Sequence, residues 1–150
     1  GGYLTAAVAL EAKRNDTPQP VLQLLIYPMT DMAGLPPSRV EETMFLDDRV
    51  LQWVISMHAS DNRLNPRASP IHATDHSGLA PAMMIAASID PLRDDGRAYA
   101  SKLQIAGVPT QYHLYQGVVH GFFNFGSFSD QANTAVQQAV SALKTAFTKD

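Results

Sequence analysis

The amino-acid sequence predicts an α/β fold, in which a mostly parallel sheet carries helices on both faces. Strand-like and helix-like stretches alternate along the chain, and such alternation is typical of parallel, helix-covered sheets. The stretch 21–27 is almost continuously apolar and lies between Pro20 and Pro28, which suits a strand buried on both faces. Together these observations predict a single layered α/β unit.

Each element is predicted from its own residue pattern. The first stretch has helical periodicity, with Leu4, Ala7, Val8 and Leu10 available for a buried face. The proline- and asparagine-rich connection 61–81 is long for a compact domain, and long loops often build sites or lids. In order, the expected elements are a helix at Tyr3–Lys13, a strand at Val21–Tyr27, a helix at Asp47–Ala59, a strand at Ala82–Ala87, a helix at Asp94–Ala106, a strand at Thr110–Tyr115 and a helix at Asp130–Phe147. The apolar residues on or near one face of the last helix are Ala132, Ala135, Val136, Ala139, Val140, Leu143 and Phe147.

Composition and charge exclude several classes of function. The 150 residues are 45% hydrophobic, which is enough for one globular domain with a buried core. A net charge of −3 without any Lys/Arg run argues against nucleic acid or an anionic membrane surface, and favours a small neutral or weakly polar ligand. No apolar run reaches the roughly 18 residues of a membrane span, and nothing near Gly1 has the pattern of a signal peptide. The absence of cysteine is compatible with cytoplasm or secretion.

Two polar residues follow strands of the predicted sheet. Asp90 comes after the strand at 82–87 and precedes Pro91, and His120 follows the strand at 110–115 and precedes a glycine. Alone, Asp90 suits a turn or helix cap and His120 suits a structural or exposed loop position. Sites in open α/β sheets gather beyond the carboxyl ends of the strands, where an acid that orients a histidine serves nucleophilic hydrolysis. We therefore expect Asp90 within hydrogen-bonding distance of a ring nitrogen of His120.

The remaining titratable residues suit structural roles better. Asp94 and Asp95 enrich the start of a predicted helix, where the helix dipole favours negative charge. The histidines at 58, 72, 76 and 113 lie in a helix, an irregular loop or a strand, and none belongs to a metal-binding pair. Paired-carboxylate glycosidase chemistry has no supporting context here. No metal site and no cofactor are expected.

The sequence resembles the hormone-sensitive-lipase family of esterases over nearly its whole length. The resemblance consists of short motifs, or landmarks, that occur in the same order as in the family. The matching residues are Gly1-Gly2, Tyr27-Pro28 with Asp31, Phe45-Leu46 before the Trp53 helix, Asn65-Pro66 with Ser69-Pro70, Gly78-Leu79 before Pro81-Ala82, Asp90-Pro91-Leu92-Arg93-Asp94-Asp95-Gly96, Ala106-Gly107-Val108 and His120-Gly121-Phe122. Each landmark is weak alone, but their order and spacing together are specific. Asp95 is a mild departure, because the family more often has Glu there.

The resemblance implies the C-terminal part of an α/β-hydrolase fold, with the N-terminal half absent from the sequence. Gly1 and Gly2 match the last two glycines of the family's Gly-Asp-Ser-Ala-Gly-Gly nucleophile elbow, so the serine belongs two positions before Gly1. The missing half would also carry the His-Gly-Gly-Gly segment of the oxyanion hole. We therefore expect an open groove or a bare sheet edge beside Val21–Tyr27.

The resemblance also implies site roles. Asp90 is the orienting acid and His120 the general base and acid of a Ser-Asp-His triad, which needs no cofactor. Residues 29–81 include a cap insertion, and the expected substrates are short to medium acyl esters. The implied substrate-binding residues are Phe45, Leu46, Trp53, Leu92 and Phe122, for which an ordinary core role is the alternative.

Other interpretations remain open at this stage. Some proteins of this fold are small-molecule receptors that have lost hydrolysis, and a partial product without function alone is a third interpretation. The presence of both Asp90 and His120 favours an enzyme. The natural substrate is undetermined, and a homodimer is left open.

Overall fold

The structure is a computed structural model that describes residues 1–41, 44–59, 61–126 and 128–148. Within these residues, three parallel strands form one sheet in the order β1-β2-β3. Leu25 of β1 pairs with Met84 of β2, and Met84 pairs with Tyr112 of β3. The predicted parallel α/β sheet is therefore confirmed. The strands are β1 at Gln23–Ile26, β2 at Ala82–Ile89 and β3 at Thr110–Val119.

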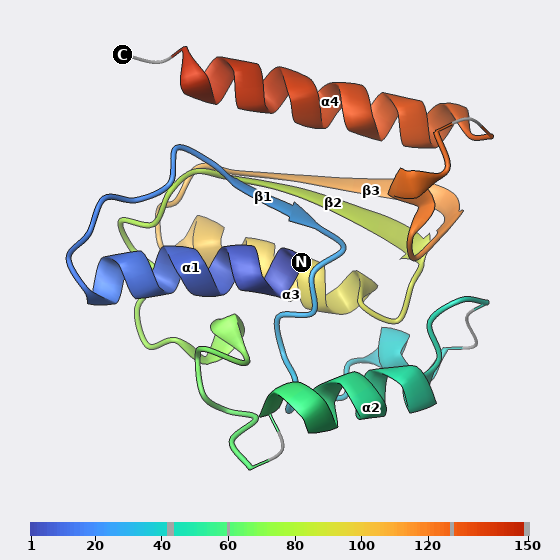
Figure 1. The fold of residues 1–150 in the computed structure, drawn as a ribbon, viewed down its shortest axis with the longest axis horizontal. Helices are drawn as coiled ribbons and strands as arrows, with labels where there is room; N and C mark the ends of the chain where they lie inside the picture. The colour runs from blue at the N-terminus through green and yellow to red at the C-terminus, as the bar shows by residue number, and fades with distance from the viewer. Residues whose placement is uncertain (42–43, 60, 127, 149–150) are drawn as a thin grey trace.

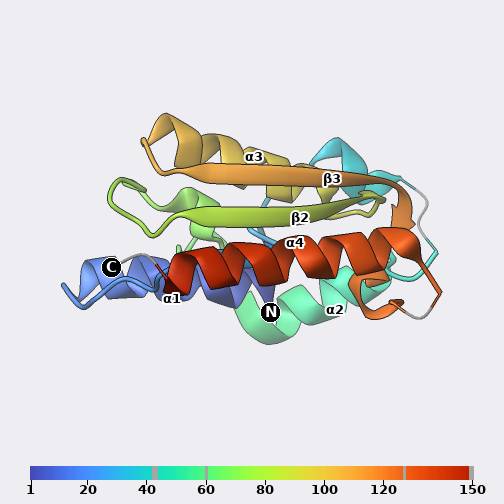
Figure 2. The same ribbon diagram turned by 90° about the horizontal axis from the view of Figure 1, so that it is seen from above.

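Helices cover both faces of this sheet. The helices α1 (Gly2–Arg14) and α3 (Arg93–Ile105) lie on one face, and α4 (Asp130–Phe147) lies on the other (Figure 1). Seen from above, α4 runs lengthwise along the strands (Figure 2). The helix α2 (Asp48–Ala59) belongs to the long connection between β1 and β2 and lies apart from the sheet. Short 3₁₀ helices are η1 at Pro37–Val40, η2 at Pro70–His72 and η3 at Phe122–Asn124.

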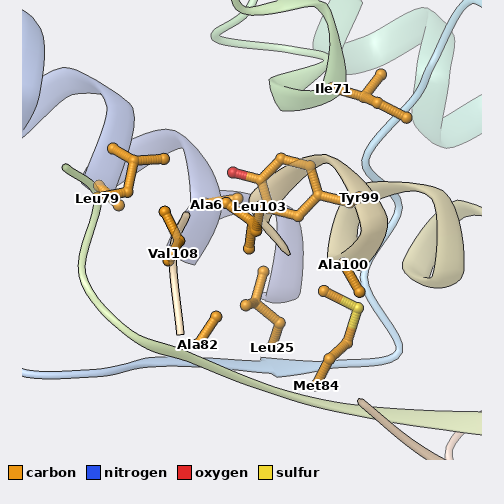
Figure 3. Close-up of a cluster of buried hydrophobic side chains, with 11 residues drawn as sticks. Ala6, Leu25, Ile71, Leu79, Ala82, Met84, Tyr99, Ala100, Leu103 and Val108 are labelled. Carbon is orange, nitrogen blue, oxygen red and sulfur yellow. The ribbon is translucent and has the colours of Figure 1, made fainter. Parts of the chain in front are cut away.

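The core has one layer on each side of the sheet because neighbouring residues of a strand point to opposite faces. Leu25 and Met84 pack with Tyr99 and Leu103 of α3 on the first face (Figure 3). Ile85 and Ala87 pack against α4 on the second face, in a cluster that comprises Ile85, Ala87, Phe122, Ala132, Ala135 and Ala139. The central strand β2 is consequently buried at every position from 82 to 87.

The buried face of α1 matches the predicted one only in part, because Ala7 is buried and Leu10 is partly buried but the other two predicted residues are exposed. Leu4 and Val8 are 52% and 59% exposed, whereas Ala6 and Ala9 are fully buried against the sheet. Small side chains let this helix approach the strands closely, and that contact outweighs the larger hydrophobicity of leucine and valine. A similar correction applies to α4, where the alanines are buried but Val140 and Phe147 are largely exposed.

The strand β1 stands at one edge of the sheet and is shorter and less buried than predicted. Leu25 is fully buried, but Val21 is 50% exposed. A groove of about 640 Å³ lies at the amino ends of the strands. Its lining includes Val21, Leu22, Pro81, Thr110, Ala142 and Ala146. Of the residues 21–27, Val21 and Leu22 line this groove, and β1 is an edge strand of the described sheet.

Within the part of the chain that the structure describes, no helix is long and apolar enough to cross a membrane.

Candidate active site

Asp90 directly follows β2 and His120 directly follows β3. Both residues lie at the opposite end of the strands from the 640 Å³ groove. Ile89, the last residue of β2, is paired with Val119, the last residue of β3. Because the strands are parallel neighbours, the residues that follow this pair leave the sheet side by side. The candidate site therefore lies beyond the carboxyl ends of the strands, while the 640 Å³ groove lies at their amino ends.

A bulge in β3 creates this alignment. Ala87 pairs with Tyr115, but the next pair is Ile89 with Val119, so β3 carries two additional residues between the pairs. Gly117 in the bulge has a φ of +71°, and its N–H donates to the Ser88 hydroxyl at 2.8 Å. The sequence predicted the end of this strand at Tyr115, whereas β3 continues to Val119. A bulge changes the direction in which nearby side chains point, and this one places His120 beside Asp90.

The two side chains are hydrogen-bonded. Nδ1 of His120 lies 2.8 Å from Oδ2 of Asp90, as the sequence led us to expect. Asp90 is only 1% exposed, and its Oδ1 accepts the backbone N–H of Leu92 at 2.8 Å. The His120 side chain is 26% exposed, and among the described residues its Nε2 has no hydrogen-bond partner. A carboxylate that accepts from Nδ1 favours the tautomer with the proton on Nδ1, which leaves Nε2 unprotonated.

Tyr27 was not predicted as a site residue, yet its ring contacts His120. The two ring centroids are 4.3 Å apart, and the Tyr27 backbone has a left-handed φ of +33° that is rare for a bulky residue. The amide of Asn124 donates to the Tyr27 hydroxyl at 3.5 Å. Burial, and next the charge of Asp90, raise the pKa of this hydroxyl. Tyr27 directly follows the last residue of β1, as Asp90 follows that of β2, and this position was the available signal.

The residues expected to bind substrate fall into two groups. Leu92 and Phe122 are 5% and 1% exposed and belong to hydrophobic clusters, Phe122 against the rings of Tyr27 and Tyr115. Phe45 and Trp53 are more than 60% exposed, and the Phe45 ring lies 6.2 Å from that of Phe125, close after His120 in the chain. Leu46 is half-buried against the cluster that contains Leu92.

Gly1 and Gly2, the glycines expected in the nucleophile elbow, differ in how closely other atoms pack around them. A Cβ atom added to Gly2 would lie 2.8 Å from Cβ of Pro28 and 2.9 Å from the carbonyl oxygen of Ile26. Gly2 therefore allows α1 to begin in close contact with the end of β1. A Cβ on Gly1 would meet nothing within 4 Å.

Asp94 and Asp95 lie in the first turn of α3, as predicted, but each also has a specific partner. Asp95 forms a buried, two-bond ion pair with Arg39, at 2.8 and 3.1 Å. Burial raises the pKa of Asp95 to about 6, although Arg39 acts in the opposite direction. Asp94 accepts the backbone N–H of Ser38 and a bond from Arg93.

A second histidine–aspartate pair occurs within the long connection. Nε2 of His72 lies 3.0 Å from Oδ1 of Asp31, which also accepts the N–H groups of Ala33 and Gly34. This carboxylate closes a tight turn. Within the described residues, no group of three histidine, aspartate or glutamate side chains could hold a metal ion.

Comparison with known proteins agrees with this fold. A family model described as the alpha/beta hydrolase fold matches residues 1–124. An ethyl acetate hydrolase of Pseudomonas putida is 37% identical over 149 residues, covering 96% of this chain and 47% of that protein. The carboxylesterase NlhH of Mycobacterium tuberculosis is 38% identical, covering 97% of this chain and 48% of that protein.

Solved structures show the same likeness. A thermostable esterase of Pseudomonas putida superposes with a TM-score of 0.93 at 34% identity, over all of this chain and 50% of that one. An esterase of Pyrobaculum calidifontis gives 0.91 at 36% identity, over 97% of this chain and 49% of that one. The chain spans about half the length of the relatives that it matches. By family model, sequence identity and structure alike, this chain belongs to the α/β-hydrolase fold family, in the branch that resembles the hormone-sensitive-lipase esterases.

Proposed function

We propose that the protein hydrolyses carboxylic esters of short to medium acyl chains with a Ser-Asp-His triad, in which His120 is the general base and Asp90 its orienting acid. The single observation that carries this proposal is the 2.8 Å bond between Asp90 and Nδ1 of His120, which leaves Nε2 without a hydrogen-bond partner among the described residues. The esterase and carboxylesterase names of the relatives support the same reaction class.

In the proposed reaction, a serine two positions before Gly1 is the nucleophile. Its oxygen bonds to the ester carbonyl carbon while Nε2 of His120 takes the hydroxyl proton, and backbone amides of the elbow region hold the oxyanion. His120 then returns the proton to the leaving alcohol as the carbon–oxygen bond breaks. Water repeats both steps on the acyl-enzyme and releases the acid. Asp90 stays ionised and keeps the imidazole in one tautomer.

We further propose that residues 29–81 include a cap that shapes the acyl pocket. Phe45 and Trp53 are its exposed apolar side chains, with Leu46 half-buried beside them. Leu92 and Phe122 would support the pocket from within the hydrophobic clusters to which they belong. The cap is the part of the molecule that would select acyl length.

The test uses the protein with the segment that precedes Gly1. Hydrolysis of p-nitrophenyl acetate, butyrate and laurate is measured for the wild type, for His120→Gln and for the matched control His113→Gln on β3. We expect saturable hydrolysis that is fastest on the shorter esters, lost in His120→Gln and retained in His113→Gln. Undiminished turnover by His120→Gln would refute the triad, and specific ligand binding without turnover by the wild type would favour the receptor interpretation.

A further inference from the structure

Two segments that are distant in sequence are joined beside the candidate site. We call residues 36–41 the cap strap and residues 90–95 the acid turn. Arg39 of the strap pairs with Asp95 of the turn, and Glu41 of the strap makes two bonds to Arg93, at 2.7 and 2.9 Å. The strap is therefore held against the turn at two points by charge.

Ser38 of the strap directly precedes Arg39 and is fully buried. Its hydroxyl donates to the carbonyl oxygen of Pro91 at 2.8 Å and accepts the N–H of Asp94 at 3.2 Å. Its own N–H donates to the carboxylate of Asp94 at 2.9 Å. Ser38 thus makes three hydrogen bonds to the acid turn.

One of these bonds is the first in a series of hydrogen bonds that leads to His120. The carbonyl of Pro91 and the N–H of Leu92 belong to the same peptide unit, and that N–H donates to Oδ1 of Asp90 at 2.8 Å. The other oxygen, Oδ2, is bonded to Nδ1 of His120. The result is one chain of hydrogen bonds that runs from the Ser38 hydroxyl through a single peptide group and the Asp90 carboxylate to the imidazole.

We propose that Ser38 is a positioning residue for the Asp90–His120 pair, through which the cap strap fixes the orientation of the catalytic acid. This inference rests on the proposed function. A peptide group that accepts a hydrogen bond at its oxygen is a better donor at its nitrogen, and it is also held in one orientation. Both effects hold the Asp90 carboxylate where it meets Nδ1. The cap is thereby coupled to the acid of the triad as well as to the substrate.

The chain offers two matched controls. Ser69 is also fully buried, and its hydroxyl likewise accepts one N–H, from Met32, and donates to one carbonyl, that of Arg63. Ser69→Ala should therefore cost stability as Ser38→Ala does, without touching the chain to His120. Glu41→Gln weakens the ionic attachment of the same strap and leaves Ser38 in place.

The experiment uses the protein with its preceding segment and compares wild type, Ser38→Ala, Ser69→Ala and Glu41→Gln. Ester kinetics are measured together with the ¹⁵N shifts of the His120 ring, assigned with a His120→Gln variant, because these shifts report the tautomer. We expect Ser38→Ala to lower kcat by about five- to tenfold, as for one lost hydrogen bond, with KM little changed. Its His120 ring should lose the single Nδ1–H tautomer, whereas both controls keep it.

Two outcomes would overturn the proposal. Unchanged kcat and ring shifts in Ser38→Ala would show that the bond to Pro91 has no effect on the pair. Equal losses in Ser38→Ala and Ser69→Ala would show that Ser38 acts only through general stability. If Ser38→Ala does not fold, Ser38→Cys keeps the size and replaces the hydroxyl with a weak donor, and it is judged by the same criteria. Should the wild type hydrolyse no ester, the proposed function fails, but the ring shifts still decide the role of Ser38.

Discussion

Oδ2 of Asp90 accepts its bond from Nδ1 of His120 at 2.8 Å, while Oδ1 of the same carboxylate accepts the N–H of Leu92 at the same distance. Both oxygens of a buried carboxylate therefore have a donor, and the carboxylate has no freedom to rotate away from the imidazole. An acid held in this way orients the ring rather than exchanging a proton with it.

Asp90→Asn in the protein with its preceding segment should leave the fold intact but lower kcat by up to about 10⁴-fold, the loss known for the equivalent change in chymotrypsin-type triads. The amide cannot enforce the Nδ1–H tautomer. Ester hydrolysis and circular dichroism together check this expectation, with Asp130→Asn at the start of α4 as the control. Near wild-type turnover would mean that another carboxylate orients His120, although Asp94 and Asp95 are already bonded to Arg93 and Arg39.

Gly2→Ala should destabilise the protein by about 1–3 kcal/mol, the range for an atom forced into a packed site. The added Cβ would come within 3 Å of Pro28 and of the Ile26 carbonyl, so α1 must shift away from β1. Urea unfolding measures the effect. Val8→Ala, at an exposed position of the same helix, should stay close to wild type, and equal stability of the two variants would contradict the close approach.

Arg39→Met should cost about 3–5 kcal/mol of stability, because it leaves the buried carboxylate of Asp95 without its partner. The double variant Arg39→Met/Asp95→Leu should recover most of that loss, since it removes both charges. Denaturant unfolding of the two variants and the wild type gives the comparison. A double variant no more stable than the single one would show that the packing of Arg39, rather than its charge, is what matters.

The same single variant should have a characteristic pH dependence. Burial already raises the pKa of Asp95 to about 6 with Arg39 present, and without Arg39 that pKa rises further. The folded chain then holds a proton that the unfolded chain, with an ordinary carboxyl pKa of about 3.9, releases. Below about pH 6 Asp95 is protonated in both folded proteins. The stability deficit of Arg39→Met should therefore be largest above the raised pKa of the variant, shrink as the pH falls toward about 6, and stay constant below that. A deficit that does not change with pH would exclude this cause.

His76 should make the protein less stable below about pH 6.5, its ordinary pKa. Burial lowers the pKa of its imidazole, which lies 3.0 Å from the carbonyl oxygen of Pro70 and beside the Tyr99 ring. The unfolded chain then binds a proton that the folded chain resists, so stability is full above that pH and falls as the pH drops. Unfolding free energies at pH 7.5 and 5.5 should differ less in His76→Gln than in the wild type. The same difference in both proteins would assign the pH effect to other groups.

The sequence by itself was enough for the α/β class, the order of the elements and the pairing of Asp90 with His120. These follow from local signals: periodicity, strand-ending prolines and glycines, and the rule that parallel strands end at one edge. The family landmarks depend on order and spacing, which the sequence also carries.

The other features of the fold and of the candidate site depend on contacts between segments that are distant in the sequence. The bulge around Gly117 that brings His120 level with Asp90 depends on the pairing of β3 with β2 and on the hydroxyl of Ser88. Whether α1 buries alanines or leucines depends on how closely it approaches the sheet, which hydrophobicity alone does not specify. Tyr27 and Ser38 reach the site from positions 93 and 82 residues before His120, and no local pattern records such distances. Tertiary packing brings them together because burial makes each unpaired polar group costly, so that buried donors and acceptors find partners wherever the fold supplies them.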